Sequence, residues 1–202
     1  ALPHVASGQL IPDAPAAAAA VPSSRGGRQA LDMEARLRDA LGLIGAYPPT
    51  AGWPAFLARY GVSIRVGTVA GGLASYRADD RTLTVDPRYV DADPRAVAAL
   101  LVHETLHAIY DATGRTGNDG KACIDEEAQA FAVQSAFWAY HHGLDGSPAA
   151  TAATAEVEAV EQELNRLLSA ALDDALVGTV ITTWAYTLRC YFPDLGTGAP
   201  EE

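Results

Sequence analysis

The chain of 202 residues is long enough for one sizeable core and a tail, but it is short for two full domains. Hydrophobic residues make up 49% of it and charged residues 19%, as in ordinary soluble domains, and no apolar run approaches the roughly 20 residues that a membrane span needs. The formal net charge of −11 argues against nucleic acid as the main partner, because phosphate binding needs clustered Lys and Arg, which this chain lacks.

Residues 1–27 are predicted to be a flexible tail or linker. They are rich in alanine and proline, end in Gly26-Gly27 and show little apolar periodicity. The chain starts at Ala1 without a methionine, as it would after removal of a signal peptide or a tag, which favours export. Residues 28–202 are then expected to form a single domain.

The first half of this domain combines helices with short strands. Apolar residues recur with helical spacing over residues 29–43, and a second, short helix is predicted over residues 53–60. The period changes to two over residues 62–66, which is typical of a half-buried strand. Residues 73–77 and 81–85 predict a hairpin. We therefore expect at least three strands in one small antiparallel sheet.

The second half is predicted to be mainly helical. Asp93 followed by Pro94 is a strong helix start, because aspartate caps free amide groups and proline fits the first helical position. Residues 177–191 are apolar enough for a buried helix, although their Val, Ile and Thr content leaves a strand open. The fold class is expected to be α+β, with the sheet packed on the helix that Asp93 starts. Helices are predicted over residues 94–112, 124–140 and 149–176.

His103, Glu104 and His107 form an H-E-x-x-H stretch inside the first of these helices. A spacing of four places both imidazoles on one helix face, one turn apart, so that two ring nitrogens can bind one metal ion. From its place beside them, Glu104 can take the proton of a metal-activated water as general base and deliver it to the leaving amine. The stretch predicts a zinc-dependent peptidase with one zinc ion per chain and a peptide or protein substrate, although short motifs also arise by chance.

A catalytic zinc ion commonly has three protein ligands, so a third ligand is required. Asp125, Glu126 and Glu127 offer three carboxylates at the start of the next predicted helix. Glu127 begins a largely apolar face that could pack against the H-E-x-x-H helix, whereas Glu126 begins a competing apolar face. We favour Glu127 over Glu126, with Asp125 behind both, and interpret the other acids as residues that stabilise the helix start.

Residues 103–111 resemble the active-site helix of the gluzincins, the metallopeptidase clan typified by thermolysin, and nineteen residues separate His107 from Glu127, a spacing similar to that of the clan. The resemblance covers about residues 82–140. It implies both histidines and Glu127 as zinc ligands and Glu104 as general base. It also implies a minimal zincin-like fold, in which the substrate binds in extended form and adds a strand to the small sheet.

One position departs from the clan. Thermolysin-like enzymes carry an aspartate four residues after the ligand glutamate, which orients a ligand histidine, whereas Phe131 stands there in this chain. A metal-bound histidine usually donates its other N–H to a carboxylate or carbonyl. Asp111 is one candidate for this role and can equally cap or solvate the end of its helix. The donor for the transition-state oxyanion stays open among Tyr76, Tyr110, His141, His142 and Tyr186.

Cys123 and Cys190 are the only cysteines, and their even number allows one disulfide in an oxidising compartment. We expect this bond, and with it an extracytoplasmic or secreted protein, against the alternative of two buried free thiols. Two other interpretations of the H-E-x-x-H stretch stay open. One is a catalytically inactive zinc-binding scaffold or regulator that acts through protein partners, and the other is a purely structural helix without metal.

Overall fold

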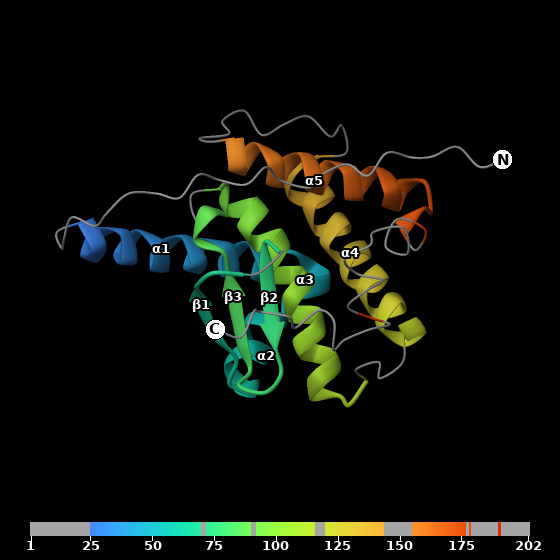
Figure 1. Ribbon diagram of the computed structural model, residues 1–202, viewed down its shortest axis with the longest axis horizontal. Helices are drawn as coiled ribbons and strands as arrows, with labels where there is room; N and C mark the ends of the chain where they lie inside the picture. The colour runs from blue at the N-terminus through green and yellow to red at the C-terminus, as the bar shows by residue number, and fades with distance from the viewer. Residues whose placement is uncertain are drawn as a thin grey trace, which may run out of the picture.

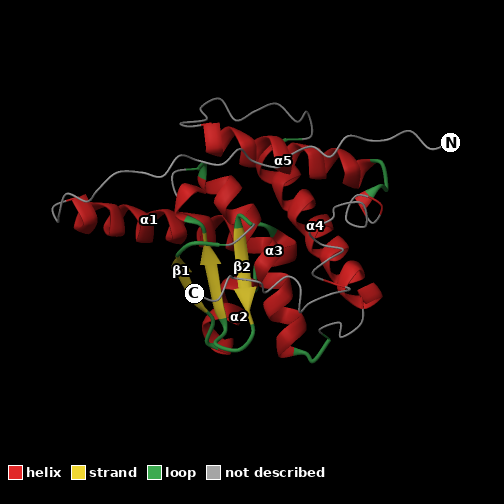
Figure 2. Ribbon diagram, viewed as in Figure 1, coloured by secondary structure: helices red, strands yellow, loops and turns green. Residues whose placement is uncertain are grey.

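The protein has an α+β fold that is mainly helical. A computed structural model describes residues 25–69, 72–89, 92–115, 120–143 and 155–176, together with Gly178 and Cys190. Within these residues the chain forms five α-helices and a three-stranded sheet (Figure 2). The expected fold class is therefore confirmed. The helices are α1 (Arg25–Ala46), α2 (Trp53–Tyr60), α3 (Pro94–Ala112), α4 (Gly120–His142) and α5 (Ala155–Leu172), with short 3-10 helices at Pro48–Thr50 and Pro87–Tyr89.

Most helices lie where the sequence predicts them. α2 and α3 have the predicted bounds, and α1 and α4 extend a few residues beyond theirs. α1 includes the last three residues of the expected tail, and residues 1–24 lie outside the described residues. α5 covers the middle of the helix expected over residues 149–176. Of the segment 177–191, for which helix and strand were both open, only Gly178 and Cys190 belong to the described residues.

The sheet has the strand order β1-β3-β2, with β1 at Ser63–Val66, β2 at Ala74–Arg77 and β3 at Thr82–Val85. β2 and β3 form the expected hairpin and are antiparallel. β1 pairs with β3 in parallel, so the sheet is mixed and the expectation of an antiparallel sheet is wrong for this pair. All four residues of β3 are buried, as suits a central strand with a neighbour on each side.

α3 starts and ends at the residues that the sequence indicates. The Asp93 carboxylate accepts a hydrogen bond of 2.8 Å from the amide of Arg95, while Pro94 occupies the first turn. The Arg95 guanidinium holds the pKa of Asp93 below its usual range, although burial opposes it. Gly114 follows the end of the helix with a φ of +64°, which glycine adopts without strain.

α3 runs through the middle of the protein. Figure 1 shows it between the sheet and α4, with α5 across the top of α4, and α3 also contacts α1. Its side chains from Ala96 to Ala108 are buried, and those from Ala96 to Val102 share one apolar core with Ile44 of α1, Leu83 of β3 and Phe137 of α4. Neighbours on several sides thus fix the helix that carries the H-E-x-x-H stretch. None of the described helices combines the length and apolar character that crossing a bilayer demands.

Candidate metal centre

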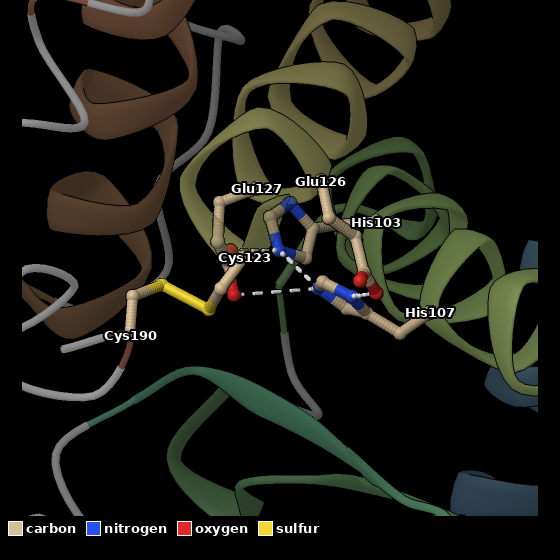
Figure 3. Close-up of a disulfide and its surroundings, with 6 residues drawn as sticks. All are labelled: His103, His107, Cys123, Glu126, Glu127 and Cys190. Carbon is tan, nitrogen blue, oxygen red and sulfur yellow. Dashed lines mark hydrogen bonds and ion pairs between the residues drawn. A yellow bond between two sulfur atoms is a disulfide. The ribbon is translucent and has the colours of Figure 1, made fainter. Parts of the chain in front are cut away.

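Two histidines of α3 and one glutamate of α4 meet inside the protein. His103 and His107 lie on consecutive turns of one face of α3, and this face is directed toward Glu127 of α4 (Figure 3). Each residue offers one nitrogen or oxygen atom within 4.8 Å of the others, and all three residues are buried. The three ligands predicted from the sequence therefore come together at a point that could hold a metal ion.

The separations among the candidate ligand atoms are short enough for all three residues to contact one metal ion. His103 Nε2 lies 3.2 Å from His107 Nε2 and 3.3 Å from Glu127 Oε2, and His107 Nε2 lies 3.7 Å from Glu127 Oε1. Ligand atoms about 2.0–2.1 Å from a zinc ion, at tetrahedral angles, are about 3.3 Å from one another. The separations of His103 from His107 and from Glu127 agree with this value, whereas the separation of 3.7 Å from His107 is to the other oxygen of Glu127. Two imidazoles and one carboxylate are also a donor set that zinc accepts.

Glu126 lies on the outer side of His107. His107 Nδ1 donates a hydrogen bond of 2.7 Å to Glu126 Oε1, which is short, as expected for a charged acceptor. Because the proton is then on Nδ1, a neutral His107 ring turns the lone pair of Nε2 toward His103 and Glu127. The sequence left Glu126 as an alternative to Glu127 for the third ligand. In the structure Glu126 instead contacts the outer nitrogen of His107, a proposed ligand.

His103 is held in a different way. Its Nδ1 atom is buried and has no hydrogen-bond partner among the described residues. Its ring packs against Phe131, with the ring centroids 4.5 Å apart. Phe131 occupies the position at which the gluzincins carry an orienting aspartate, so an aromatic contact stands where the clan has a carboxylate. Packing therefore restricts the orientation of the His103 ring.

Several buried carboxylates gather around the two imidazoles. The exposed fractions are 6% for His103, 7% for Glu104, 9% for His107 and 2% for Glu127. Burial lowers the pKa of His107, but the hydrogen bond with Glu126 and the charges of Glu127 and Glu104 outweigh it and raise this pKa above its usual value. Burying carboxylates together is costly unless a positive charge balances them. The cluster therefore favours a bound cation.

Glu104, the predicted general base, contributes a buried carboxylate beside this cluster. Its Oε2 atom is buried and has no hydrogen-bond partner within the described part of the chain. The charge of Glu104 acts on His107 and favours the protonated ring. A carboxylate oxygen with no donor of its own is available to accept a proton, which is the property that a general base needs.

Two acids considered in the sequence lie away from the cluster. Asp125 forms an exposed ion pair with Lys121 on the outer face of α4. Asp111 accepts hydrogen bonds from the hydroxyls of Tyr76, at 2.8 Å, and Tyr60, at 3.2 Å. Burial and the hydrogen bond to Asp111 raise the pKa of Tyr76. Asp111 thus links α3 to β2 and α2, and Glu126 has the contact with His107 for which Asp111 was a candidate.

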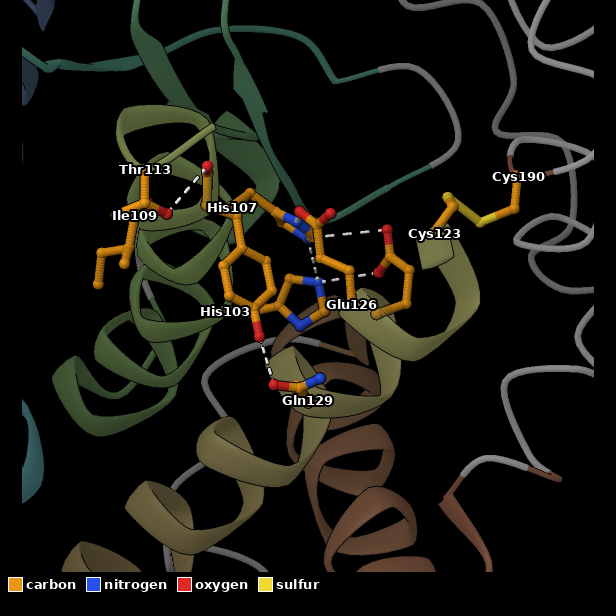
Figure 4. Close-up of polar contacts among 10 residues, drawn as sticks. His103, His107, Ile109, Thr113, Cys123, Glu126, Gln129 and Cys190 are labelled. Atoms are coloured by element: carbon orange, nitrogen blue, oxygen red, sulfur yellow. Dashed lines mark hydrogen bonds and ion pairs between the residues drawn. A yellow bond between two sulfur atoms is a disulfide. The ribbon is translucent and has the colours of Figure 1, made fainter. Parts of the chain in front are cut away.

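The other candidates for the oxyanion donor contact groups outside the cluster. The Tyr110 hydroxyl donates to the side chain of Gln129, a contact drawn in Figure 4. His141 Nε2 lies 3.2 Å from a backbone carbonyl of α1, and the His142 ring packs on an aromatic ring of its own helix. Tyr186 lies outside the described residues. The role remains unassigned.

Cys123 and Cys190 form the disulfide expected from the sequence, with a Cα–Cα distance of 5.4 Å. Cys123 is in the first turn of α4, close to the cluster (Figure 3). A cavity of about 570 Å³ lies instead between α2 and the end of α3, where Trp53, Phe56 and Ile109 are among its lining residues. No residue of the cluster lines this cavity, so we assign it no part in the site.

No protein-family model, curated protein or solved structure matches this chain. The resemblance to the gluzincins therefore remains a prediction from the H-E-x-x-H stretch and the glutamate that follows it. The candidate metal centre is argued from its own distances, burial and charge.

Proposed function

We propose that the chain is a zinc-dependent peptidase of the gluzincin type. The observation that carries this proposal is the meeting of buried His103, His107 and Glu127, with one ligand atom of each within 4.8 Å of the others, beside the buried carboxylate of Glu104. A set of two histidines and one glutamate is typical of catalytic zinc sites, whereas structural zinc sites have four protein ligands and are rich in cysteine. Both cysteines of this chain are used in a disulfide.

The residues divide the chemistry among them. When bound, a zinc ion would supply Lewis acidity, which lowers the pKa of a water molecule to about 7 and polarises a carbonyl group. His103, His107 and Glu127 would hold the ion, and Glu126 would fix the tautomer of His107. Glu104 would accept a proton from the attacking water at Oε2 and then deliver it to the leaving amine. This proton transfer would allow the water to hydrolyse the peptide bond.

The peptide substrate is proposed to bind along β2. This strand lies at the edge of the described sheet, and Tyr76 on it is hydrogen bonded to Asp111 of α3. An extended peptide that pairs with such an edge would run beside the helix that carries Glu104. The substrate would then be bound mainly through its backbone, which favours a peptide or protein over a small molecule.

The burial of the cluster favours a second candidate function. Each of the three proposed ligands and Glu104 is less than one tenth exposed. A zinc-binding scaffold that acts through protein partners would need no access for a substrate, so such burial would suit it well. This alternative retains the proposed metal centre and differs from the peptidase only in turnover.

The disulfide favours a protein that works in an oxidising compartment. Disulfides persist in secreted and extracytoplasmic proteins and are rare in reducing compartments. We therefore propose that the protein works outside the cytoplasm.

Replacement of Glu104 distinguishes the two functions. The wild type, loaded with one equivalent of zinc, should cleave peptides in a mixed library, and Glu104→Gln should bind zinc while losing nearly all turnover, because a general base contributes about 10²–10⁴-fold. Glu163→Gln, which changes an exposed residue of α5 paired with Arg166, is the matched control and should keep full activity. Cleavage that survives in Glu104→Gln defeats the peptidase mechanism, and a zinc-loaded wild type without cleavage favours the scaffold.

A further inference from the structure

A disulfide lies beside the helix turns that supply the carboxylates of the cluster. Cys123 is in the first turn of α4, and Glu126 and Glu127 follow three and four residues later, so that the three project from one side of the helix. Figure 3 shows the S–S bond next to Glu127, with the Glu126 carboxylate on the other side of the two histidine rings. Through this bond Cys190, 67 residues further along the chain, is joined to the start of α4.

The cross-link is part of an apolar cluster that reaches a ligand ring. Cys190 is buried in one cluster with Ile124 and Phe131 of α4 and Leu167 of α5. Phe131 in turn packs on the ring of His103. The disulfide, the first half of α4 and a proposed ligand therefore belong to one packed unit.

Both halves of α4 pack on α3, but they differ in their other apolar neighbours. The second half enters the main core through Phe137 and Trp138, together with α1, α3 and the sheet. Glu126 and Glu127 lie in the first half, where the apolar packing comes from the smaller cluster with the disulfide and from the contact of Ala130 with Leu106 and Tyr110 of α3. Helix ends open more readily than helix centres, whereas a metal ligand must stay within about 0.5 Å of its productive position. The disulfide cluster therefore supplies apolar packing at the N-terminal end of α4, next to the turn that carries Glu126 and Glu127.

We propose that the Cys123–Cys190 disulfide positions Glu127 as metal ligand and Glu126 as the partner of His107, and so sets the metal affinity of the centre. This inference rests on the metal site of the proposed function and is independent of peptide hydrolysis. Loss of the cross-link should let the first turns of α4 open while α3, which is buried in the main core, keeps both histidines in place.

The test is the zinc dissociation constant of the full chain, measured by competition with a chromophoric chelator. Cys123→Ala/Cys190→Ala should bind zinc about tenfold more weakly or worse, as when a group that supports a ligand is removed. Leu57→Ala is the matched control, because it removes a buried side chain of α2, whose main helix contacts are with α1 and α3. It should lower the melting temperature and change zinc affinity by less than about twofold.

A second readout separates positioning from general stability. In the metal-free alanine pair, amide hydrogen exchange should become faster over the first turns of α4 and stay unchanged in α3, at a temperature where far-ultraviolet circular dichroism shows a folded chain. If the alanine pair does not fold, Cys123→Val/Cys190→Ala, which refills the apolar volume, supplies the same two measurements.

Each result decides the inference. Zinc affinity that is equal in the wild type and the cysteine variant overturns it, and so does an equal loss of affinity in Leu57→Ala. A wild type that binds no zinc overturns both this inference and the proposed function. Zinc binding that depends on the disulfide, in a protein that cleaves no peptide, supports the inference and removes only the peptidase activity.

Discussion

Replacing Glu126 by Gln should weaken zinc binding about tenfold while leaving the fold intact. The side chains of His107 and Glu126 are 11% and 12% exposed, and their hydrogen bond is 2.7 Å long. A hydrogen bond to a charged group contributes about 1.5–3 kcal/mol and one between neutral groups about 0.5–1.5 kcal/mol. Gln keeps an acceptor of similar shape but loses the charge, so about 1–1.5 kcal/mol of metal-binding free energy should be lost, which is close to tenfold.

The assay is competition for zinc with a chromophoric chelator at about pH 8, where protons compete less with zinc than they do at lower pH. This pH matters because the Glu126 charge also raises the pKa of His107. At a lower pH, Glu126→Gln would reduce proton binding to His107, and this would mask part of the loss of zinc affinity. Glu163→Gln on α5 changes the same group in an exposed ion pair and should have no effect. An affinity of Glu126→Gln equal to that of the wild type would refute the role assigned to Glu126.

Two further predictions concern pH and helix capping. The raised pKa of His107 stabilises the metal-free fold below about pH 6.5, and this contribution is lost as pH rises through the folded pKa. Since zinc needs the unprotonated ring, the rise in melting temperature on zinc addition should grow from about pH 6 to about pH 8, and a flat profile in thermal scans would contradict this. Asp93→Ala removes the cap of α3 and should lower the free energy of unfolding by about 1 kcal/mol in urea titrations, with Asp80→Ala in the exposed hairpin turn as control.

Local rules made much of the site predictable from the sequence. The spacing of His103 and His107 fixes their common face once the helix is known, and Asp93-Pro94 marks the start of that helix. Helical phase also favoured Glu127, but burial along the helix does not separate the two acids, because Phe131 and Trp138 on the face of Glu127 and Ala130 and Phe137 on the face of Glu126 are all buried. Period and capping suffice here because each depends on residues within a few turns of one another.

Contacts between distant segments were beyond such rules. The alternating pattern of β1 indicates which face is buried but carries no information on the direction of its neighbour, so the parallel pairing with β3 could not be foreseen. The place of Glu126 behind His107 was missed for a related reason. Glu126 has a different helical phase from Glu127. Its carboxylate contacts His107 only because its side chain extends from α4 to α3. The sequence did contain a signal for this role. Glu126 is adjacent to the favoured ligand Glu127, and the aspartate that orients a histidine in thermolysin-like enzymes is missing from this chain.

The most direct test of the proposed metal centre is the zinc content of the purified protein, determined by elemental analysis for the wild type and for His103→Ala, Glu126→Ala and Glu127→Ala. We expect about one zinc ion per wild-type chain, lost with His103 and Glu127 and only weakened with Glu126, because catalytic zinc ions commonly have three protein ligands. A wild type that holds no zinc even after reconstitution, or a site that survives without Glu127 but not without Glu126, would contradict the proposed centre.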